Sequence, residues 1–295
     1  DNRVSPVQRK LMTTGKDENV FNIAIKGNFD DCQNLVKSMF ADKKFSSDIK
    51  MSGVNSINWA RIIAQSVYYF YSYLSVEDAS EPTNFSVPTG NFGDVYAGYL
   101  AKKMGLPIDK LIVATNQNDI LHRAISKGSY EAEKVSETIS PSMDIQIASN
   151  FERLIFDLNN GDDQQTSLDM KNIKEKGQYL INDDKLNKIS ENFLSARMSE
   201  DETLEVIKNV YEKFAVVLDP HTAIGYGAFD KHNLKGNNIV LATAHPCKFP
   251  GAIQSAINVK AELPNELTFV LDQKENYDIV ENDIEKVKQH IKDRT

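Results

Sequence analysis

Short apolar runs alternate with stretches of helical periodicity along this chain, a pattern typical of α/β proteins. In the strongest example, an apolar run at 84–88 leads into a turn that contains Gly90 and Gly93. A helical stretch follows, ends at Gly105, and is succeeded by a second apolar run at 110–116. A strand, a helix and a strand of these lengths fit the crossover that joins two parallel strands. The pattern therefore predicts an α/β fold.

The remaining elements follow from the same two signals. Apolar runs predict further strands at 20–25, 145–148 and 239–243. Helical spacing or long apolar stretches predict helices at 32–40, 62–73 (a buried helix), 119–127, 150–158 and 284–291. Ser199 and Glu202 have the spacing of a capping box, so another helix is expected to start there. Residues 159–184 are polar with little periodicity and are interpreted as a surface insertion.

Charge and composition narrow the possible partners. The 34 Lys and Arg residues against 42 Asp and Glu residues leave a formal net charge of −8, so no general attraction to nucleic acid or anionic membranes is expected. No apolar stretch reaches the roughly 18 residues that span a bilayer, and the polar start has no signal-peptide core. We expect a cytoplasmic protein, or an organellar one without its transit peptide. Cys32 and Cys247 lie far apart, so neither disulfides nor a metal site is expected.

The turn at residues 89–94 is the best candidate for binding chemistry. Its two glycines, three residues apart at a junction from strand to helix, let backbone N–H groups converge on an anion at the positive end of the helix. A phosphate group would suit such a site. The spacing is neither the Rossmann nor the Walker pattern, so it does not favour a nicotinamide or a nucleoside triphosphate. Two glycines at such a turn can also be purely structural.

Seven sequence blocks, read in order, give this chain its resemblance to a known family. They are NSINWAR at 55–61, PTGNFGD at 88–94, ATNQNDIL at 114–121, SPSMDI at 140–145, SNFERL at 149–154, DPHTA at 219–223 and ATAHP at 242–246. Together they resemble the threonine synthases of the longer fungal and enterobacterial type, over nearly the whole chain.

The resemblance implies a lyase of threonine biosynthesis that depends on pyridoxal 5′-phosphate and has fold type II. Such an enzyme converts O-phosphohomoserine and water into threonine and phosphate. The implied fold is a mostly parallel sheet flanked by helices, with part of a smaller α/β domain. By this analogy residues 1–52 belong to a small mobile domain and residues 53–295 form the large cofactor-binding domain. A monomer or a weak homo-oligomer is expected.

The resemblance also assigns cofactor-binding residues. The cofactor phosphate would lie on the glycine turn, through Gly90, Asn91, Phe92 and Asp94. Asp94 could instead serve only as an acidic residue at the helix N-terminus, because a carboxylate repels a phosphate unless it caps the helix or orients the loop amides. Thr243 matches the residue that hydrogen-bonds the pyridine nitrogen, and a hydroxyl there leaves the ring a weaker electron sink than a carboxylate would.

Substrate phosphate needs cations, and arginine suits this task because its guanidinium binds phosphate bidentately. Arg61 and Arg153 lie inside matching blocks, beside polar residues that include Ser149 and Asn150, and these four are the candidate substrate ligands. An arginine here could instead pair with a neighbouring acid such as Glu152. His221 and His245 also fall in matching blocks but are expected to brace the backbone, so they are left out of the catalytic residues.

The chain departs from the family in one respect that affects catalysis. The family's Schiff-base lysine lies in an amino-terminal Phe-Lys-Asp motif, and neither this motif nor the later Ser-Gly-Asp-Thr-Gly-like loop occurs here. Lys231, in Phe229-Asp230-Lys231, has the wrong order and is not a substitute. We therefore expect no catalytic residue in this chain, an amino-terminal part missing from it, and no activity of the chain alone. Two alternatives stay open: a phospholyase acting on amino-alcohol phosphates, and a non-catalytic relative that binds the cofactor.

Overall fold

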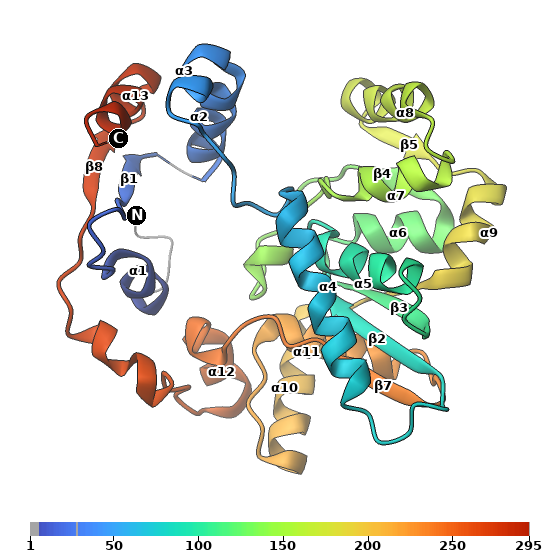
Figure 1. Ribbon diagram of the computed structural model, residues 1–295. Helices are drawn as coiled ribbons and strands as arrows, with labels where there is room; N and C mark the ends of the chain where they lie inside the picture. The colour runs from blue at the N-terminus through green and yellow to red at the C-terminus, as the bar shows by residue number, and fades with distance from the viewer. Residues whose placement is uncertain (1–5, 28, 295) are drawn as a thin grey trace. The chain divides into compact units, whose positions relative to one another are not determined.

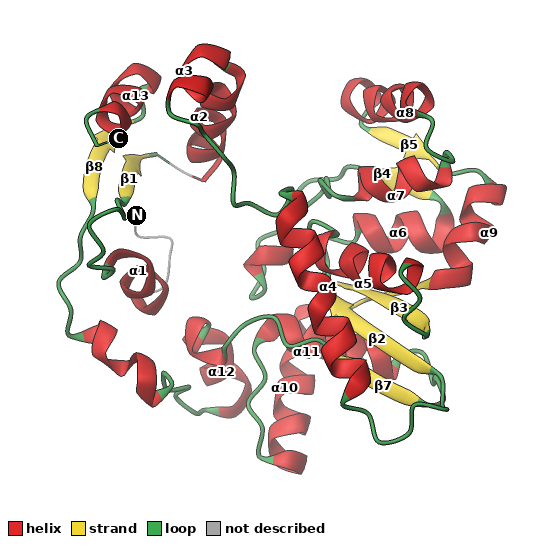
Figure 2. Cartoon of the chain, viewed as in Figure 1, coloured by secondary structure: helices red, strands yellow, loops and turns green. Residues whose placement is uncertain are grey.

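The computed structural model describes residues 6–27 and 29–294, which divide into two compact units (Figures 1 and 2). The larger unit comprises residues 54–261, and the smaller unit combines the residues up to 53 with those from 262 onward. No helix in the part of the chain that the structure describes has the length and apolar character needed to cross a membrane.

A four-stranded parallel sheet forms the centre of the larger unit. Its strands, in the order β6-β3-β2-β7, are Phe193–Arg197, Ile108–Thr115, Thr83–Pro88 and Asn237–Val240. Every neighbouring pair is parallel. All their carboxyl ends therefore lie at one edge of the sheet, where open α/β sheets bind ligands. The predicted crossover from β2 through α5 (Gly93–Lys103) to β3 is confirmed.

Helices cover both faces of this sheet because side chains alternate along each strand. Leu111 and Val113 of β3 belong to one apolar cluster, which also takes in residues of α5, α6 (Ile120–Lys127) and α7 (Phe151–Leu158). The intervening Ile112 and Ala114 belong to a second cluster, formed with α11 (Pro220–Asp230). The remaining helices of the larger unit are α4 (Trp59–Leu74), α8 (Asp163–Lys176), α9 (Asp183–Asn192), α10 (Glu200–Phe214), α12 (Pro250–Ile257), and the short η1 (Pro141–Met143) and η2 (Pro246–Lys248).

Three local expectations are corrected by the structure. Residues 145–148, predicted as a strand, form no regular element. The presumed insertion at 159–184 is folded: it contains α8 and the strand β5 (Gln178–Leu180), which pairs antiparallel with β4 (Ser129–Glu131). Helix α4, expected to be buried, buries Ile62 but leaves Ile63 largely exposed. The polar composition of α8 gave no sign of its buried Ile173, and α4 has apolar residues on its exposed face as well as on its buried one, so its exposure was not evident.

The smaller unit is held by pairing between distant parts of the chain. Strand β1 (Ile23–Lys26) pairs in parallel with β8 (Asp278–Glu281), far along the sequence. Leu35, Met39 and Phe45 form a buried cluster with Val287 of α13 (Ile284–Lys292). The other helices of this unit are α1 (Pro6–Thr13), α2 (Phe29–Ala41), α3 (Lys43–Asp48) and η3 (Asn265–Leu271).

The predicted division into residues 1–52 and 53–295 thus differs from the structure at its far end. The first boundary lies at Gly53, one residue from the expected place, but residues 262–294 group with the smaller unit and not with the larger one. The reason is the β1–β8 pairing and the shared apolar cluster, which the order of residues in the sequence does not reveal. That the smaller unit moves over a substrate stays a prediction.

The contact between α4 and α5 leads to a first mutational prediction. A Cβ atom added to Gly98 of α5 would overlap the buried ring of Tyr69 and lie 2.9 Å from Cδ2 of Leu111. Replacing Gly98 by alanine should therefore overpack this core and reduce the free energy of unfolding by about 1–3 kcal/mol. Urea unfolding measures the change. An unchanged unfolding midpoint would show that the two helices separate without cost.

Candidate functional site

The glycine turn lies at the carboxyl edge of the sheet, between β2 and α5. It follows Pro88, which ends β2 and pairs with Ala114 of β3, and the N–H of Thr89 donates to the carbonyl oxygen of Ala114 at 2.8 Å. On the other side of β2, Ser86 pairs with Val240, the last residue of β7. The segments that follow β2 and β7 therefore leave the sheet at the same edge, next to each other.

The backbone N–H groups of residues 90–93 are free to bind a ligand. Among the residues that the structure describes, none accepts a hydrogen bond from these four groups. Phe92 caps α5 in the left-handed conformation (φ 64°), and no side chain caps this helix end. Unpaired N–H groups at a helix N-terminus form a site for an anion, because the helix dipole adds to their partial positive charge. A phosphate group fits this donor set.

Gly90 is glycine because the backbone of η1 packs against it. A Cβ atom at this position would lie 2.6 Å from the carbonyl oxygen of Ser142 and 3.3 Å from the Cα atom of Met143. Both are backbone atoms, which cannot rotate away. The turn is thus seated on η1, an arrangement that the spacing of glycines alone did not predict.

Phe92 contributes its backbone to the turn and its side chain to the core. Its ring is fully buried, 5.2 Å from the ring of Phe151 and 5.8 Å from that of Phe193, measured between centroids. Only its N–H group can therefore face a ligand. This agrees with a role in a backbone cradle and excludes a side-chain contact.

The candidate substrate residues Ser149 and Asn150 contact the same turn. The hydroxyl of Ser149 donates to Oδ1 of Asn91 (3.1 Å), and the backbone N–H of Asn150 donates to the carbonyl oxygen of Asn91 (3.0 Å). The buried amide of Asn150 also donates to the carbonyl oxygens of Asn91 and Ser56. The side-chain amide of Asn150 is therefore already hydrogen-bonded within the protein, whereas the exposed hydroxyl of Ser149 can rotate to bind a ligand.

The two candidate arginines differ in how firmly they are held. Arg153 donates through Nε to Oδ1 of Asn150 (3.0 Å) and through Nη2 to the carbonyl oxygen of Ile57 (2.9 Å), and its guanidinium lies over the ring of Trp59. It forms no ion pair with Glu152, the alternative considered from the sequence. Arg61 is exposed, and among the described residues its guanidinium has a single hydrogen bond, a long contact of 3.5 Å to the carbonyl oxygen of Val54, while its charge also acts on Asp94.

Asp94 lies in the first turn of α5 with its carboxyl group largely buried. Burial raises the pKa of this carboxyl to about 6, while a hydrogen bond with Tyr69 and the charge of Arg61 act in the opposite direction. The hydroxyl of Tyr69 donates to the carbonyl oxygen of Asp94 at 2.8 Å and lies 3.3 Å from its Oδ1. Asp94 therefore orients the start of α5 through Tyr69 and does not cap it. A carboxyl with this pKa can also be neutral beside a phosphate.

This raised pKa predicts a change of stability with pH. An acid whose pKa is higher in the folded protein destabilises it when ionised, so the free energy of unfolding should fall as the pH rises from about 3.8 to about 6. Replacing Asp94 by asparagine should remove this term, which is at most about 3 kcal/mol, and make the variant more stable at pH 7. Urea unfolding at several pH values measures it. Identical pH profiles for both proteins would contradict the assignment.

Thr243 lies in the loop that follows β7, whereas the sequence had predicted that the strand extends to this residue. Strand β7 ends at Val240, and Thr243 is exposed. Its backbone N–H donates to Oγ1 of Thr222 (3.3 Å), and within the described residues its own hydroxyl has no partner. An exposed, unpartnered hydroxyl at the ligand-binding edge of the sheet can hydrogen-bond a heterocyclic nitrogen.

A set of buried polar residues at the start of α11 was not predicted from the sequence. Asp219, His221 and Thr222 are each less than a tenth exposed and bonded to one another. His221 is the second residue of α11 and braces backbone, as expected, by accepting the N–H of Ser142. The available signal was the Asp-Pro pair at 219–220, typical of a helix start.

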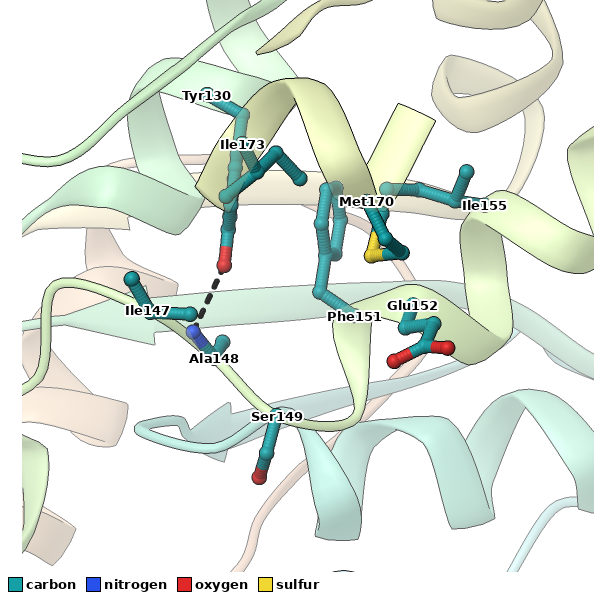
Figure 3. A pocket seen from close by; sticks show the side chains of 9 residues that line it. All are labelled: Tyr130, Ile147, Ala148, Ser149, Phe151, Glu152, Ile155, Met170 and Ile173. Atoms are coloured by element: carbon teal, nitrogen blue, oxygen red, sulfur yellow. Dashed lines mark hydrogen bonds between the residues drawn. The ribbon is translucent and has the colours of Figure 1, made fainter. Parts of the chain in front are cut away.

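A small cavity of about 70 Å³ lies behind Ser149 (Figure 3). Phe151, Ile155, Met170 and Ile173 line it with apolar atoms, and the hydroxyl of Tyr130 accepts the N–H of Ala148 at 2.8 Å. The cavity is too small for an aromatic cofactor, since it has about half the volume of an engineered cavity of about 150 Å³ that binds benzene. Ser149 is the candidate-site residue in its lining, so the cavity adjoins the site without being able to hold the cofactor.

The ammonium group of Lys231 is bound within the protein framework. Its Nζ donates to the carbonyl oxygen of Arg197 (2.8 Å) and pairs with Glu202 (2.7 Å) in the capping box of α10. This agrees with its exclusion as a cofactor-binding lysine.

Comparisons with known proteins agree with this geometry. The family model described as "Threonine synthase, C-terminal" matches residues 222–291. A threonine synthase from Pseudomonas aeruginosa is 45% identical over 98% of this chain and 62% of its own length, and one from Saccharomyces cerevisiae is 43% identical over 99% and 62%. The chain thus spans about three fifths of the length of these relatives.

The solved structures show the same relationship. A threonine synthase from Brucella melitensis with bound pyridoxal phosphate superposes with a TM-score of 0.96, at 46% identity, over all of this chain and 64% of its own. The yeast enzyme superposes with a TM-score of 0.89, at 42% identity, over 98% and 62%. The predicted fold class, α/β of pyridoxal-phosphate fold type II, is confirmed.

Proposed function

We propose that this chain, which is homologous to the carboxyl-terminal part of threonine synthases, supplies most of the cofactor site of a threonine synthase. The complete enzyme would convert O-phosphohomoserine and water into threonine and phosphate. The observation that carries the proposal is the row of four unpartnered N–H groups at residues 90–93, at the ligand-binding edge of the sheet.

The residues of this chain fit pyridoxal phosphate at both of its ends. The N–H groups of Gly90, Asn91, Phe92 and Gly93 would hold the phosphate, helped by the dipole of α5. The hydroxyl of Thr243 would hydrogen-bond the pyridine nitrogen, since β2 and β7 place both segments at one edge. The bound cofactor supplies an electron sink for bond breaking at the amino acid, and a neutral partner such as Thr243 keeps that sink weak.

The substrate would meet Ser149, Arg61 and Arg153. Ser149 is exposed and contacts Asn91 in the same turn, so it can orient a group bound there. Arg61 is the better candidate for a substrate phosphate, because the guanidinium of Arg153 is already bonded to Asn150 and Ile57. Asn150 supports the turn rather than the substrate.

The proton-transferring lysine would come from the amino-terminal region of the family, since no Phe-Lys-Asp motif occurs in these 295 residues. Borohydride reduction of this chain with pyridoxal phosphate, followed by peptide mass analysis, tests this directly. No single lysine should be labelled stoichiometrically. Clean labelling of one lysine would show that the catalytic lysine lies in this chain.

Turnover of O-phosphohomoserine by the complete enzyme tests the reaction itself. Threonine and phosphate in equal amounts are the expected products. Phosphate and ammonia with a keto acid would instead identify a phospholyase, and cofactor binding without turnover would identify a non-catalytic relative. A cytoplasmic location and a monomeric or weakly oligomeric state stay predictions, for cell fractionation and gel filtration to test.

A further inference from the structure

We infer that the start of α11 is a positioning device that holds the phosphate end and the ring-nitrogen end of the cofactor site in one arrangement. His221 would hold η1, the segment that packs against the glycine turn, and Thr222 would hold the loop that carries Thr243. This inference rests on the proposed function, because it concerns the same cofactor.

Asp219 organises the device. Its carboxylate caps α11 by accepting the backbone N–H groups of His221 (2.9 Å) and Thr222 (3.4 Å). The same carboxylate accepts the hydroxyl of Thr222 through Oδ2 and lies 2.9 Å from Nδ1 of His221 through Oδ1. One buried carboxylate thus orients two side chains, and buried carboxylates need such donors to offset their desolvation.

His221 transmits this orientation to the glycine turn. A carboxylate can only accept a hydrogen bond, so Nδ1 of His221 carries the hydrogen and is the donor to Asp219. Nε2 of the neutral ring is then free to accept a hydrogen bond. Nε2 accepts the backbone N–H of Ser142 at 3.3 Å. The carbonyl oxygen of Ser142 is the atom that packs against Gly90. His221 therefore fixes the backbone on which the phosphate-binding turn is seated.

Thr222 transmits the same orientation to the other end of the site. Its hydroxyl donates to Asp219, so its lone pairs are free to accept the backbone N–H of Thr243 at 3.3 Å. This bond continues the link of the β7 segment to β2, where Leu241 donates to the carbonyl oxygen of Ser86 (3.0 Å). Thr222 therefore sets the position of the Thr243 hydroxyl.

Removing the His221–Ser142 bond and removing the Thr222–Thr243 bond should change cofactor binding in different ways. A general loss of stability would not produce this difference. In the complete enzyme, His221→Ala should weaken binding of pyridoxal phosphate about tenfold while changing the affinity for pyridoxal, which lacks the phosphate, less than twofold. Thr222→Val should reduce the affinities for pyridoxal phosphate and for pyridoxal by the same factor. It should also shift the absorption maximum of the bound cofactor, because the hydrogen bond to its ring nitrogen is displaced. Thr222→Ser, which keeps the hydroxyl, should restore the absorption maximum.

Matched controls come from the same chain. Thr203→Val removes a buried hydroxyl that bonds the carbonyl oxygen of Ser199 at the start of α10, and His122→Gln alters a histidine paired with Ser195. Neither should change cofactor affinity or absorption. If His221→Ala does not fold, His221→Leu is measured in the same way, since leucine keeps more of the side-chain volume and offers Ser142 no acceptor.

The outcomes separate this inference from the proposed function. If the unaltered enzyme binds no pyridoxal phosphate, the proposed function fails. If it binds the cofactor, but His221 variants weaken pyridoxal phosphate and pyridoxal equally, or Thr222→Val leaves the absorption unchanged, the positioning role is wrong and α11 is only structural.

Discussion

Replacing Gly90 by alanine is expected to reduce the affinity of the complete enzyme for pyridoxal phosphate by about 100-fold, because hydrogen bonds to a charged group contribute about 1.5–3 kcal/mol and each 1.4 kcal/mol is about tenfold in affinity. The added Cβ would lie 2.6 Å from the carbonyl oxygen of Ser142 and 3.3 Å from Cα of Met143. Neither atom can rotate away, so the turn itself must shift. Its N–H groups would then no longer converge on the phosphate. Titration of the enzyme with cofactor, followed by absorption, measures the loss.

Gly251→Ala is the control for this substitution. No described atom lies within 4 Å of a Cβ added at Gly251, which occupies the first turn of α12. Alanine there should leave cofactor affinity unchanged and stabilise the protein by roughly 0.5–1 kcal/mol, because alanine favours the helix. Normal cofactor affinity in the Gly90→Ala enzyme would contradict the phosphate cradle.

Replacing Phe92 by alanine is expected to cost about 3–5 kcal/mol of the free energy of unfolding. The ring is fully buried between the rings of Phe151 and Phe193, so its loss leaves a cavity where the glycine turn meets the core. Urea unfolding measures the cost. Phe156→Ala, on the exposed side of α7 where the side chain is 41% exposed, should cost much less.

A second substitution at Phe92 separates its side chain from its backbone. The residue has φ 64°, in the left-handed region that disfavours every residue with a Cβ by about 1–2 kcal/mol. Phe92→Gly should therefore be no less stable than Phe92→Ala, although glycine removes one more carbon. A glycine variant clearly less stable than the alanine variant would show that the left-handed conformation is not strained here.

Local sequence patterns predicted much of the larger unit correctly. The strand, glycine turn, helix and strand from β2 to β3 follow from residues close together in the sequence, and so does the capping box at Ser199 and Glu202. The strand predicted at 145–148 does not form, and the segment is a loop in which the N–H of Ala148 donates to the hydroxyl of Tyr130. Apolar character alone cannot distinguish these two environments.

Part of the candidate site could likewise be predicted from the sequence, and part of it could not. The glycine turn could be recognised from its spacing, since the geometry of a strand-to-helix turn is set by adjacent residues. The support of that turn could not, because the bond from Ser142 to His221 joins residues 79 positions apart. The spacing of apolar residues along a chain does not indicate which two distant segments will be in contact.

The amino-acid sequence by itself determined the α/β class, the glycine turn and the resemblance to threonine synthases, all of which depend on short-range patterns or on ordered blocks. Only the tertiary structure decided that residues 262–294 pack with the smaller unit, that Phe92 faces the core, and that Asp219 links both ends of the candidate site. The physical reason is that burial and hydrogen bonding between distant segments depend on how the whole chain packs. Each segment alone is compatible with many partners.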